Sequence, residues 1–168
     1  MILGIIPARY ASTRFPGKPL IDIAGKSMIQ RVYEKARQAK SLHAVVVATD
    51  DQRIADHVRS FGGEAVMTTA HHPSGTDRCL DALQQLKQDY QYIINIQGDE
   101  PFIEPEQIDE LASVLRDGST ELATQVIRVD SHALLFDKSV VKVVLKINNE
   151  ALYFSRMVIY IVGRNAGT

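Results

Sequence analysis

Short runs of consecutive apolar residues alternate along much of the chain with longer segments in which apolar residues recur every three or four positions. The short runs are rich in β-branched side chains and show no polar alternation. This pattern is typical of strands that are buried on both faces of a parallel sheet. We therefore predict four buried strands, at residues 2–6, 44–48, 65–67 and 92–96.

The longer segments predict amphipathic helices, each with a recognisable start. The sequence Ser-Met-Ile-Gln at residues 27–30 fits a capping box, Thr76 is the expected N-cap of a later helix, and Pro105 suits the first turn of another. The apolar stripes that define the expected buried faces are Met28, Ile29, Val32, Tyr33 and Ala36; Ile54, Ala55, Val58 and Phe61; Leu80, Leu83 and Leu86; and Ile108, Leu111, Ala112 and Leu115.

Four successive strand–helix units are the pattern of a doubly wound α/β fold, with a mostly parallel sheet and helices on both faces. The pattern then changes: residues 122–129, 140–147 and 151–155 read as strands, and the Asn-Asn-Glu between the last two predicts a hairpin turn. We expect residues 1–120 to form the α/β core and residues 121–168 to begin a smaller mixed β region, the two together making one domain.

Composition narrows the class of protein. With 45% hydrophobic and 23% charged residues among 168, the chain can bury a core, and disorder is excluded. The single cysteine, Cys79, is expected to be packed and fits a reducing compartment. No apolar run is long enough to span a bilayer, and no signal peptide precedes Arg9, so we expect a cytoplasmic protein without a membrane partner.

The charges are unevenly distributed along the chain. Residues 1–40 carry a net charge of +6 and the remainder carries −7. This asymmetry favours a local anion site near the N-terminus over a nucleic-acid-binding surface.

In an open α/β sheet the ligand lies beyond the carboxyl ends of the strands, so the segments after the predicted strands are the candidates for chemistry. Arg9, Arg14 and Lys18 lie close together on the loop after the first strand. Cations and backbone N–H groups are what a triphosphate requires, although a solvated basic loop has the same charge content. The loop lacks the glycine patterns of a dinucleotide-binding fold and of a P-loop.

Two further strand exits carry polar side chains. Asp99 and Glu100 follow the fourth strand, where a carboxylate can hold Mg²⁺ against a triphosphate or can simply cap the next helix. Residues 74–78, Ser-Gly-Thr-Asp-Arg, place donors at a helix N-terminus, where they suit an anion or a base edge, or serve only as caps. The adjacent His71 and His72 are expected to be exposed loop residues and not metal ligands.

These segments together resemble the 3-deoxy-manno-octulosonate cytidylyltransferase family over residues 1–156. In the related sialate cytidylyltransferases the middle of the first motif is Gly-Gly-Ser, whereas this chain has Tyr-Ala-Ser-Thr at residues 10–13. The motifs that carry the resemblance, in order, are Ile-Ile-Pro-Ala-Arg-Tyr-Ala-Ser-Thr-Arg-Phe-Pro-Gly-Lys-Pro (5–19), Val-Ala-Thr-Asp (47–50), Met-Thr (67–68), Ser-Gly-Thr-Asp-Arg (74–78), Gln-Gly-Asp-Glu-Pro (97–101), Val-Lys-Val-Val (141–144) and Ala-Leu-Tyr-Phe-Ser-Arg (151–156).

The resemblance implies a nucleotide-diphospho-sugar transferase-like, Rossmann-like fold, in which the α/β core binds the nucleotide and the later β region serves the sugar and dimerisation. It implies transfer of CMP from CTP to the eight-carbon acid sugar 3-deoxy-manno-octulosonate (KDO), with release of diphosphate, for lipopolysaccharide biosynthesis in a Gram-negative bacterium. It also implies Mg²⁺ as cofactor and a homodimer.

The same resemblance assigns residues. Gln97 could face the sugar instead of the nucleotide, and Arg156 is a candidate for contact with the carboxylate of the sugar. The residues assigned to catalysis are Arg9, Arg14, Lys18 and Asp99, with Asp99 as the Mg²⁺ ligand, and those that frame the nucleotide are Ala8, Ser12, Thr68, Gly75, Thr76, Arg78 and Gln97.

The family usually continues past residue 156 into a C-terminal region with sugar-binding residues, dimer contacts and a second metal-binding aspartate. Residues 157–160 fit that continuation only in part and the sequence ends at Thr168, so we expect a truncated product or a sugar-binding half that is largely absent. Two alternatives stay open: a cytidylyltransferase for sialic acid or a related acid sugar, and a nucleotide-binding protein without catalytic activity.

Overall fold

The computed structural model describes residues 1–11, 15–115 and 118–159 of the chain. The chain divides into two compact units, Met1–Ala123 and Thr124–Thr168. The first unit contains the predicted sheet and the predicted helices, and the second contains a short helix and a β-hairpin.

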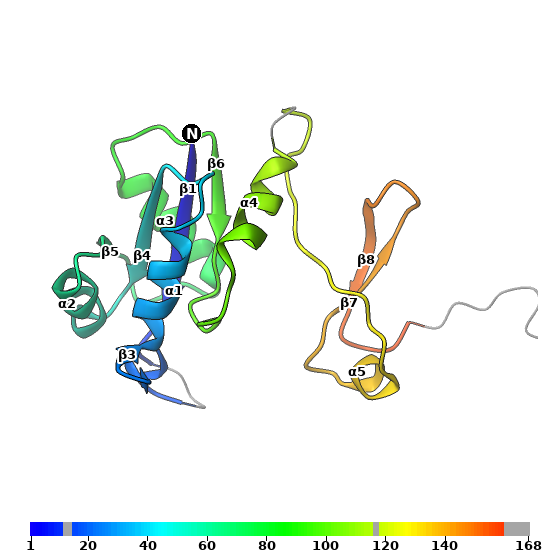
Figure 1. The fold of residues 1–168 in the computed structure, drawn as a ribbon, viewed down its shortest axis with the longest axis horizontal. Coiled ribbons are helices and arrows are strands. Elements are labelled where there is room, and N and C mark those ends of the chain that lie inside the picture. Colours follow the sequence, from blue (N-terminus) through cyan, green and yellow to red (C-terminus); the bar gives the residue numbers. More distant parts are fainter. Residues whose placement is uncertain (12–14, 116–117, 160–168) are drawn as a thin grey trace, which may run out of the picture. The chain divides into compact units, whose positions relative to one another are not determined.

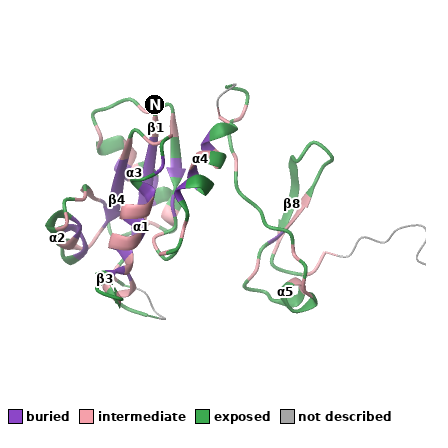
Figure 2. Cartoon of the chain, in the orientation of Figure 1, coloured by how far each residue is buried: buried purple, intermediate pink, exposed green. Residues whose placement is uncertain are grey.

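The first unit is built on a four-stranded parallel sheet with the strand order β5-β4-β1-β6 (Figure 1). The four strands are β1 (Ile2–Ala8), β4 (Ala44–Thr49), β5 (Ala65–Met67) and β6 (Tyr92–Asn95), which confirms the predicted parallel sheet. The apolar runs form strands here because β1 and β4 are covered on both faces and expose almost no side chain (Figure 2).

Helices cover both faces of this sheet, as predicted. The helices α1 (Met28–Ala36), α2 (Gln52–Ser60) and α4 (Pro105–Ser113) pack on one face, and α3 (Gly75–Gln85) packs on the other. The first face buries Ile6, Val45, Val47 and Ile94 of the sheet together with Ile96 just after β6, and the second buries Leu3, Ile5, Val46 and Ala48. With 11 residues, α3 is the longest described helix, and no helix among the described residues could cross a membrane.

Two of the three helix starts predicted from the sequence are found in the structure, and the third lies at a different residue. The Ser27 hydroxyl accepts a hydrogen bond from the backbone N–H of Gln30 at 3.2 Å, and Pro105 is the first residue of α4. The cap of α3, however, is Ser74 and not Thr76. Its hydroxyl accepts from the backbone N–H of Asp77 at 3.2 Å, because Ser74 is the last residue with extended backbone before the helix.

The buried face of α3 also differs from the predicted leucine stripe. Leu80 is 51% exposed, whereas Arg78, Cys79 and Ala82 are buried. Because Cys79 and Ala82 are small, they let the helix approach β1 and β4 closely. Leu83 and Leu86 of the predicted stripe pack against the same face as partly buried neighbours. The prediction that Cys79 is packed is confirmed.

Small elements that were not predicted follow the basic loop. A 3₁₀ turn, η1 (Lys18–Leu20), leads into a short antiparallel pair formed by β2 (Asp22–Ile23) and β3 (Lys26–Ser27). These elements are too short to leave a periodic signal in the sequence. They carry the chain from the basic loop into α1.

The second unit contains α5 (His132–Phe136) and an antiparallel hairpin of β7 (Lys142–Leu145) and β8 (Ala151–Ser155), which confirms the predicted hairpin. The strand predicted at residues 122–129 is wrong, since this segment is neither strand nor helix. A strand requires a hydrogen-bonding partner, and within the described residues nothing covers Leu122 or Ile127, which are 92% and 91% exposed.

Candidate functional site

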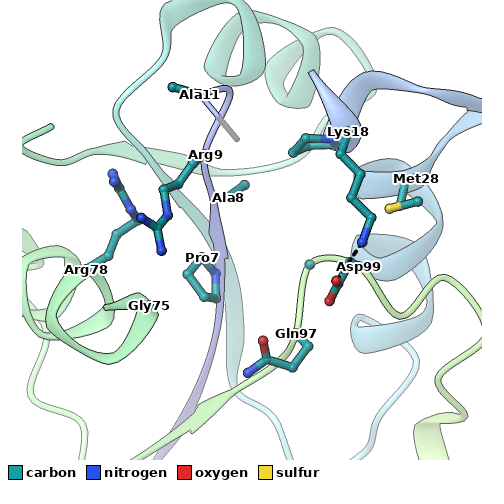
Figure 3. Close-up of a pocket in the computed structure, with 12 residues that line it drawn as sticks. Pro7, Ala8, Arg9, Ala11, Lys18, Met28, Gly75, Arg78, Gln97 and Asp99 are labelled. Atoms are coloured by element: carbon teal, nitrogen blue, oxygen red, sulfur yellow. Dashed lines mark hydrogen bonds and ion pairs between the residues drawn. The ribbon is translucent and has the colours of Figure 1, made fainter. Parts of the chain in front are cut away.

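A cavity of about 430 Å³ opens at the carboxyl ends of β1 and β6 (Figure 3). The chain leaves β5 at one side of the sheet and returns in β6 on the far side of β1, so the strand order reverses between β1 and β6. Crevices at such a reversal are the usual ligand sites of open α/β sheets, because neighbouring loops diverge there. The lining residues are Pro7, Ala8, Arg9, Ala11, Lys18, Pro19, Met28, Gly75, Arg78, Gln97, Gly98 and Asp99.

The structure brings together seven of the residues singled out from the sequence: Ala8, Arg9, Lys18, Gly75, Arg78, Gln97 and Asp99. Ser12 and Arg14 lie outside the described residues. Thr68 and Thr76 do not line this cavity: Thr68 is buried behind Arg78, and Thr76 is exposed in the first turn of α3.

Sequence reasoning missed several lining residues, among them Met28 and Gly98. Met28 belongs to an apolar helix stripe, which reads as core, but its place at the first position of α1 brings it to the cavity. Gly98 could have been predicted from the sequence, since a glycine directly after a buried strand indicates that another backbone segment approaches closely. A Cβ atom at Gly98 would lie 2.9 Å from the carbonyl oxygen of Pro7.

An ion pair spans the mouth of the cavity. Lys18 Nζ lies 2.6 Å from Asp99 Oδ2, and the two side chains are 40% and 54% exposed. A pair this exposed contributes about 0–1 kcal/mol, so it does not lock the two loops together. Both groups are therefore accessible to a ligand that carries negative charge and a cation.

Arg78 is held differently, by a buried network. Its side chain is 1% exposed, and its guanidinium donates to Asp50 Oδ2 at 3.1 Å and to Thr68 Oγ1 at 2.5 Å. These contacts join α3 to the carboxyl ends of β4 and β5, which places Gly75 beside Pro7 at the cavity wall. Asp50 was not predicted as a site residue, although it ends one of the motifs quoted above.

Among the residues that the structure describes, one cation at the cavity has no matched carboxylate. Figure 3 shows Arg9 and Arg78 on one side of Pro7 and the Lys18–Asp99 pair on the other. Lys18 faces Asp99 and Arg78 faces Asp50, whereas no carboxylate among the described residues pairs with Arg9. An exposed, unpaired guanidinium in a concave site attracts anions, and phosphate in particular, through its two-pronged donor geometry.

The loop between β5 and α3 is fastened to the helix by His72, which was expected to be exposed. His72 Nε2 lies 2.7 Å from Asp81 Oδ2 and 2.9 Å from Thr69 Oγ1. The backbone N–H of Thr69 donates to the same carboxylate at 2.9 Å. That backbone bond, with help from Gln85 and His72, lowers the pKa of Asp81 to about 2.

Two further observations concern the described cysteine, histidine and carboxylate side chains. Burial raises the pKa of the Cys79 thiol to about 11, so this cysteine is a packed side chain and not a nucleophile. No group of three or more His, Cys, Asp or Glu side chains within residues 1–11, 15–115 and 118–159 is arranged to hold a metal ion by itself.

Comparison with known proteins identifies the family of the chain. The sequence pattern of the family described as cytidylyltransferase matches residues 3–168. The chain belongs to the cytidylyltransferase family. The pattern covers both the cavity-lining unit and the β7–β8 hairpin, so the family relationship is not limited to the sheet.

Individual relatives narrow the resemblance within the family. The chain is 54% identical over 158 residues to the 3-deoxy-manno-octulosonate cytidylyltransferase of Cytophaga hutchinsonii, covering 94% of this chain and 63% of the relative. It is 55% identical over 167 residues to the enzyme of the same name from Parabacteroides distasonis, covering 96% and 66%. The chain thus spans less than two thirds of the length of these curated relatives.

Two solved structures with similar folds also belong to enzymes that are named for the transfer or synthesis of cytidylyl compounds. The structure of CMP:2-keto-3-deoxy-manno-octonic acid synthetase complexed with CTP superposes with a TM-score of 0.88 at 46% identity, covering 98% of this chain and 67% of that one. A cytidylyltransferase from Leptospira borgpetersenii superposes with a TM-score of 0.59 at 24% identity, over 70% of this chain and 50% of that one. The second similarity is one of fold alone.

The buried network predicts a large effect of removing Asp50. We expect Asp50→Ala to destabilise the first unit by about 3–5 kcal/mol, because it leaves the Arg78 guanidinium buried without its charge partner. Asp56→Ala is the matched control, since Asp56 pairs with Arg59 at the surface, and it should cost about 1 kcal/mol or less. Urea unfolding followed by circular dichroism measures both, and equal costs would contradict the role given to the network.

The low pKa of Asp81 predicts a pH-dependent stability. Its carboxyl has a pKa of about 2 in the folded chain and 3.8 in its ordinary state, so its contribution is fully present above about pH 4 and is lost as the pH falls to about 2. We expect Asp81→Asn to lower the free energy of unfolding near neutral pH, and the difference from the unsubstituted chain to shrink over that range. A difference that stays constant with pH in urea unfolding, or one reproduced by Asp89→Asn, would show the assignment to be wrong.

Proposed function

We propose that this chain binds CTP in the cavity at the ends of β1 and β6 and serves transfer of its cytidylyl group to 3-deoxy-manno-octulosonate. The observation that carries the proposal is the convergence of Arg9, Lys18 and Asp99 at the strand reversal. The chain that holds them is about half identical to 3-deoxy-manno-octulosonate cytidylyltransferases over more than nine tenths of its length.

The reaction is a displacement at phosphorus. The anomeric hydroxyl oxygen of the sugar forms a bond to the α-phosphorus of CTP, the bond from that phosphorus to the bridging oxygen breaks, and diphosphate leaves with the electron pair. The hydroxyl proton passes to solvent. Attack on a polyanion is governed by positioning and by neutralisation of charge, and both are what a cationic cavity on a rigid sheet supplies.

In this proposal, each polar residue of the cavity has a task. Arg9 and Lys18 bind the triphosphate, together with Arg14 and with Ser12 assisting, which lie outside the described residues. The nucleotide is framed by Ala8, Gly75, Arg78 and Gln97, whereas Thr68 and Thr76, which were also expected to frame it, do not line the cavity. Because Arg78 is buried against Asp50 and Thr68, its part is to hold the α3 wall in place, and Thr68 acts through it.

The residues of the cavity fit a magnesium ion that arrives with the nucleotide. Mg²⁺ is usually held by one or two carboxylates together with substrate phosphates and water, and the exposed carboxylate of Asp99 supplies one such ligand. When bound, the ion neutralises charge on the phosphate oxygens. Asp99 would orient it, and Lys18, released from Asp99, would turn its ammonium group to the triphosphate.

The wider setting is proposed from the family relationship. The product would be the activated acid sugar for lipopolysaccharide biosynthesis in the cytoplasm of a Gram-negative bacterium, and the whole protein would be a homodimer. The exposed apolar side chains of β8, among them Leu152, Tyr153 and Phe154, support an interface on the second unit.

The decisive experiment offers CTP and Mg²⁺ to the chain with each acid sugar in turn. We expect diphosphate release with 3-deoxy-manno-octulosonate, little with sialic acid, and loss of release in Asp99→Asn by orders of magnitude. Release with sialic acid alone would favour the other acid-sugar branch. CTP binding by calorimetry without any release would identify a nucleotide-binding protein without turnover, and no CTP binding would overturn the proposal.

A second test separates a shaped phosphate site from diffuse charge. We expect Arg9→Lys, which keeps the net charge, to weaken CTP binding about tenfold, because lysine cannot replace the two-pronged contact of a guanidinium with phosphate. Arg37→Ala removes a charge from the exposed end of α1 and should change the affinity less than about twofold. Calorimetry at matched salt measures both, and equal losses would mean that only the net charge of the N-terminal segment matters.

A further inference from the structure

Two of the cationic residues that line the cavity, Arg9 and Lys18, flank a hydrogen bond between backbone groups. The N–H of Gly17 donates to the carbonyl oxygen of Tyr10 at 2.9 Å. Arg9 immediately precedes Tyr10, Lys18 immediately follows Gly17, and both line the cavity. The bond between Tyr10 and Gly17 therefore determines how far apart the backbones of Arg9 and Lys18 lie.

The Tyr10 ring is held on one side by Gly17. Gly17 has a backbone φ of 72°, and a Cβ atom at this position would lie 3.3 Å from the ring of Tyr10. A side chain there would be strained by this φ and crowded by the ring. The glycine thus lets its backbone lie close against the tyrosine.

Tyr10 also packs against the hydrophobic core, and a further contact of its ring comes from α2, outside the cavity. The guanidinium carbon of Arg53 lies 3.3 Å from the centroid of the Tyr10 ring. Arg53 is itself oriented by Asp51, the N-cap of α2, through Nε to Oδ1 at 2.9 Å and Nη2 to Oδ2 at 2.6 Å. This two-pronged bond holds the plane of the guanidinium, and it also lowers the pKa of Asp51.

We propose that Arg53 is a positioning residue for nucleotide binding, which acts through the Tyr10 ring to hold Arg9 and Lys18 at the separation that the triphosphate requires. The proposal rests on the CTP-binding function proposed above. Arg53 does not line the cavity, so within the described residues its route to the ligand is through Tyr10. Its side chain is 60% exposed, and a cation–π contact at such a site predicts an effect of about two- to fivefold on affinity.

The test compares CTP affinity by calorimetry, at matched salt, among single substitutions and one double substitution. We expect Arg53→Ala and Tyr10→Leu each to weaken binding about two- to fivefold, and the double variant to be no weaker than either, because both remove one contact. Tyr10→Phe keeps the ring and should bind as the unsubstituted chain does. Arg59→Ala is the matched control, since Arg59 lies on the same helix, is exposed and pairs with Asp56.

A second readout reports on the loop without any nucleotide. We expect the amide hydrogen of Gly17 to exchange faster in Arg53→Ala and Tyr10→Leu, but not in Tyr10→Phe or Arg59→Ala, because the bond to the Tyr10 carbonyl opens more often. Far-ultraviolet circular dichroism and the urea midpoint check that the variants are folded. If Arg53→Ala does not fold, the test is the difference in CTP affinity and in Gly17 exchange between Tyr10→Leu and Tyr10→Phe.

The outcomes distinguish the two proposals. If the unsubstituted chain does not bind CTP, the proposed function fails, and an unchanged Gly17 exchange rate in Arg53→Ala would then overturn the inference independently. If the chain binds CTP but Arg53→Ala behaves as Arg59→Ala does, the proposed function stands and the positioning role is wrong. Additive losses in the double variant would also overturn it, since Arg53 would then act by a route other than Tyr10.

Discussion

Every part of the candidate site depends on the parallel pairing of β1 with β4 on one side and with β6 on the other. The register runs from Leu3 beside Ala44 to Ala8 beside Thr49, and from Ile2 beside Tyr92 to Ile5 beside Asn95. Because all three strands point the same way, their exits lie at one edge of the sheet. The basic loop after β1, the partly buried carboxylate of Asp50 after β4 and the acidic turn after β6 are neighbours for that reason.

On this framework the charges of the cavity are held in three different ways. Arg78 is buried and matched by Asp50, so it belongs to the wall and contributes rigidity. Lys18 and Asp99 form an exposed pair that a charged ligand can separate at little cost. Arg9 has no such partner among the described residues. A rigid wall, one separable pair and one unpaired cation together suit a ligand with several negative charges and an accompanying metal ion.

The sequence by itself determined the fold class and the place of the site. Four apolar runs, separated by helical stripes, predict a parallel sheet because strands without polar alternation need cover on both faces, and the two central strands, β1 and β4, are buried in this way. Since ligands lie at the carboxyl ends of such strands, the positions of Arg9, Lys18, Gln97 and Asp99 in the sequence already placed them at one edge. The hairpin of β7 and β8 followed from its turn residues in the same way.

Only the tertiary structure decided what depends on contacts between distant segments. Local pattern assigned Leu80 to the core and residues 122–129 to a strand, but burial and strand pairing depend on the surface that another element presents. The partner of Arg78 is Asp50, which lies 28 residues away in the sequence. Arg53 of α2 contacts Tyr10, which lies on the loop after β1. Periodicity reports the hydrophobic face of one segment and contains no information on which side chain of another segment will satisfy a charge. The sequence therefore placed Arg9, Lys18 and Asp99 at the candidate site, and tertiary packing decided that Thr68 and Thr76 lie outside the cavity and that Met28 and Gly98 line it.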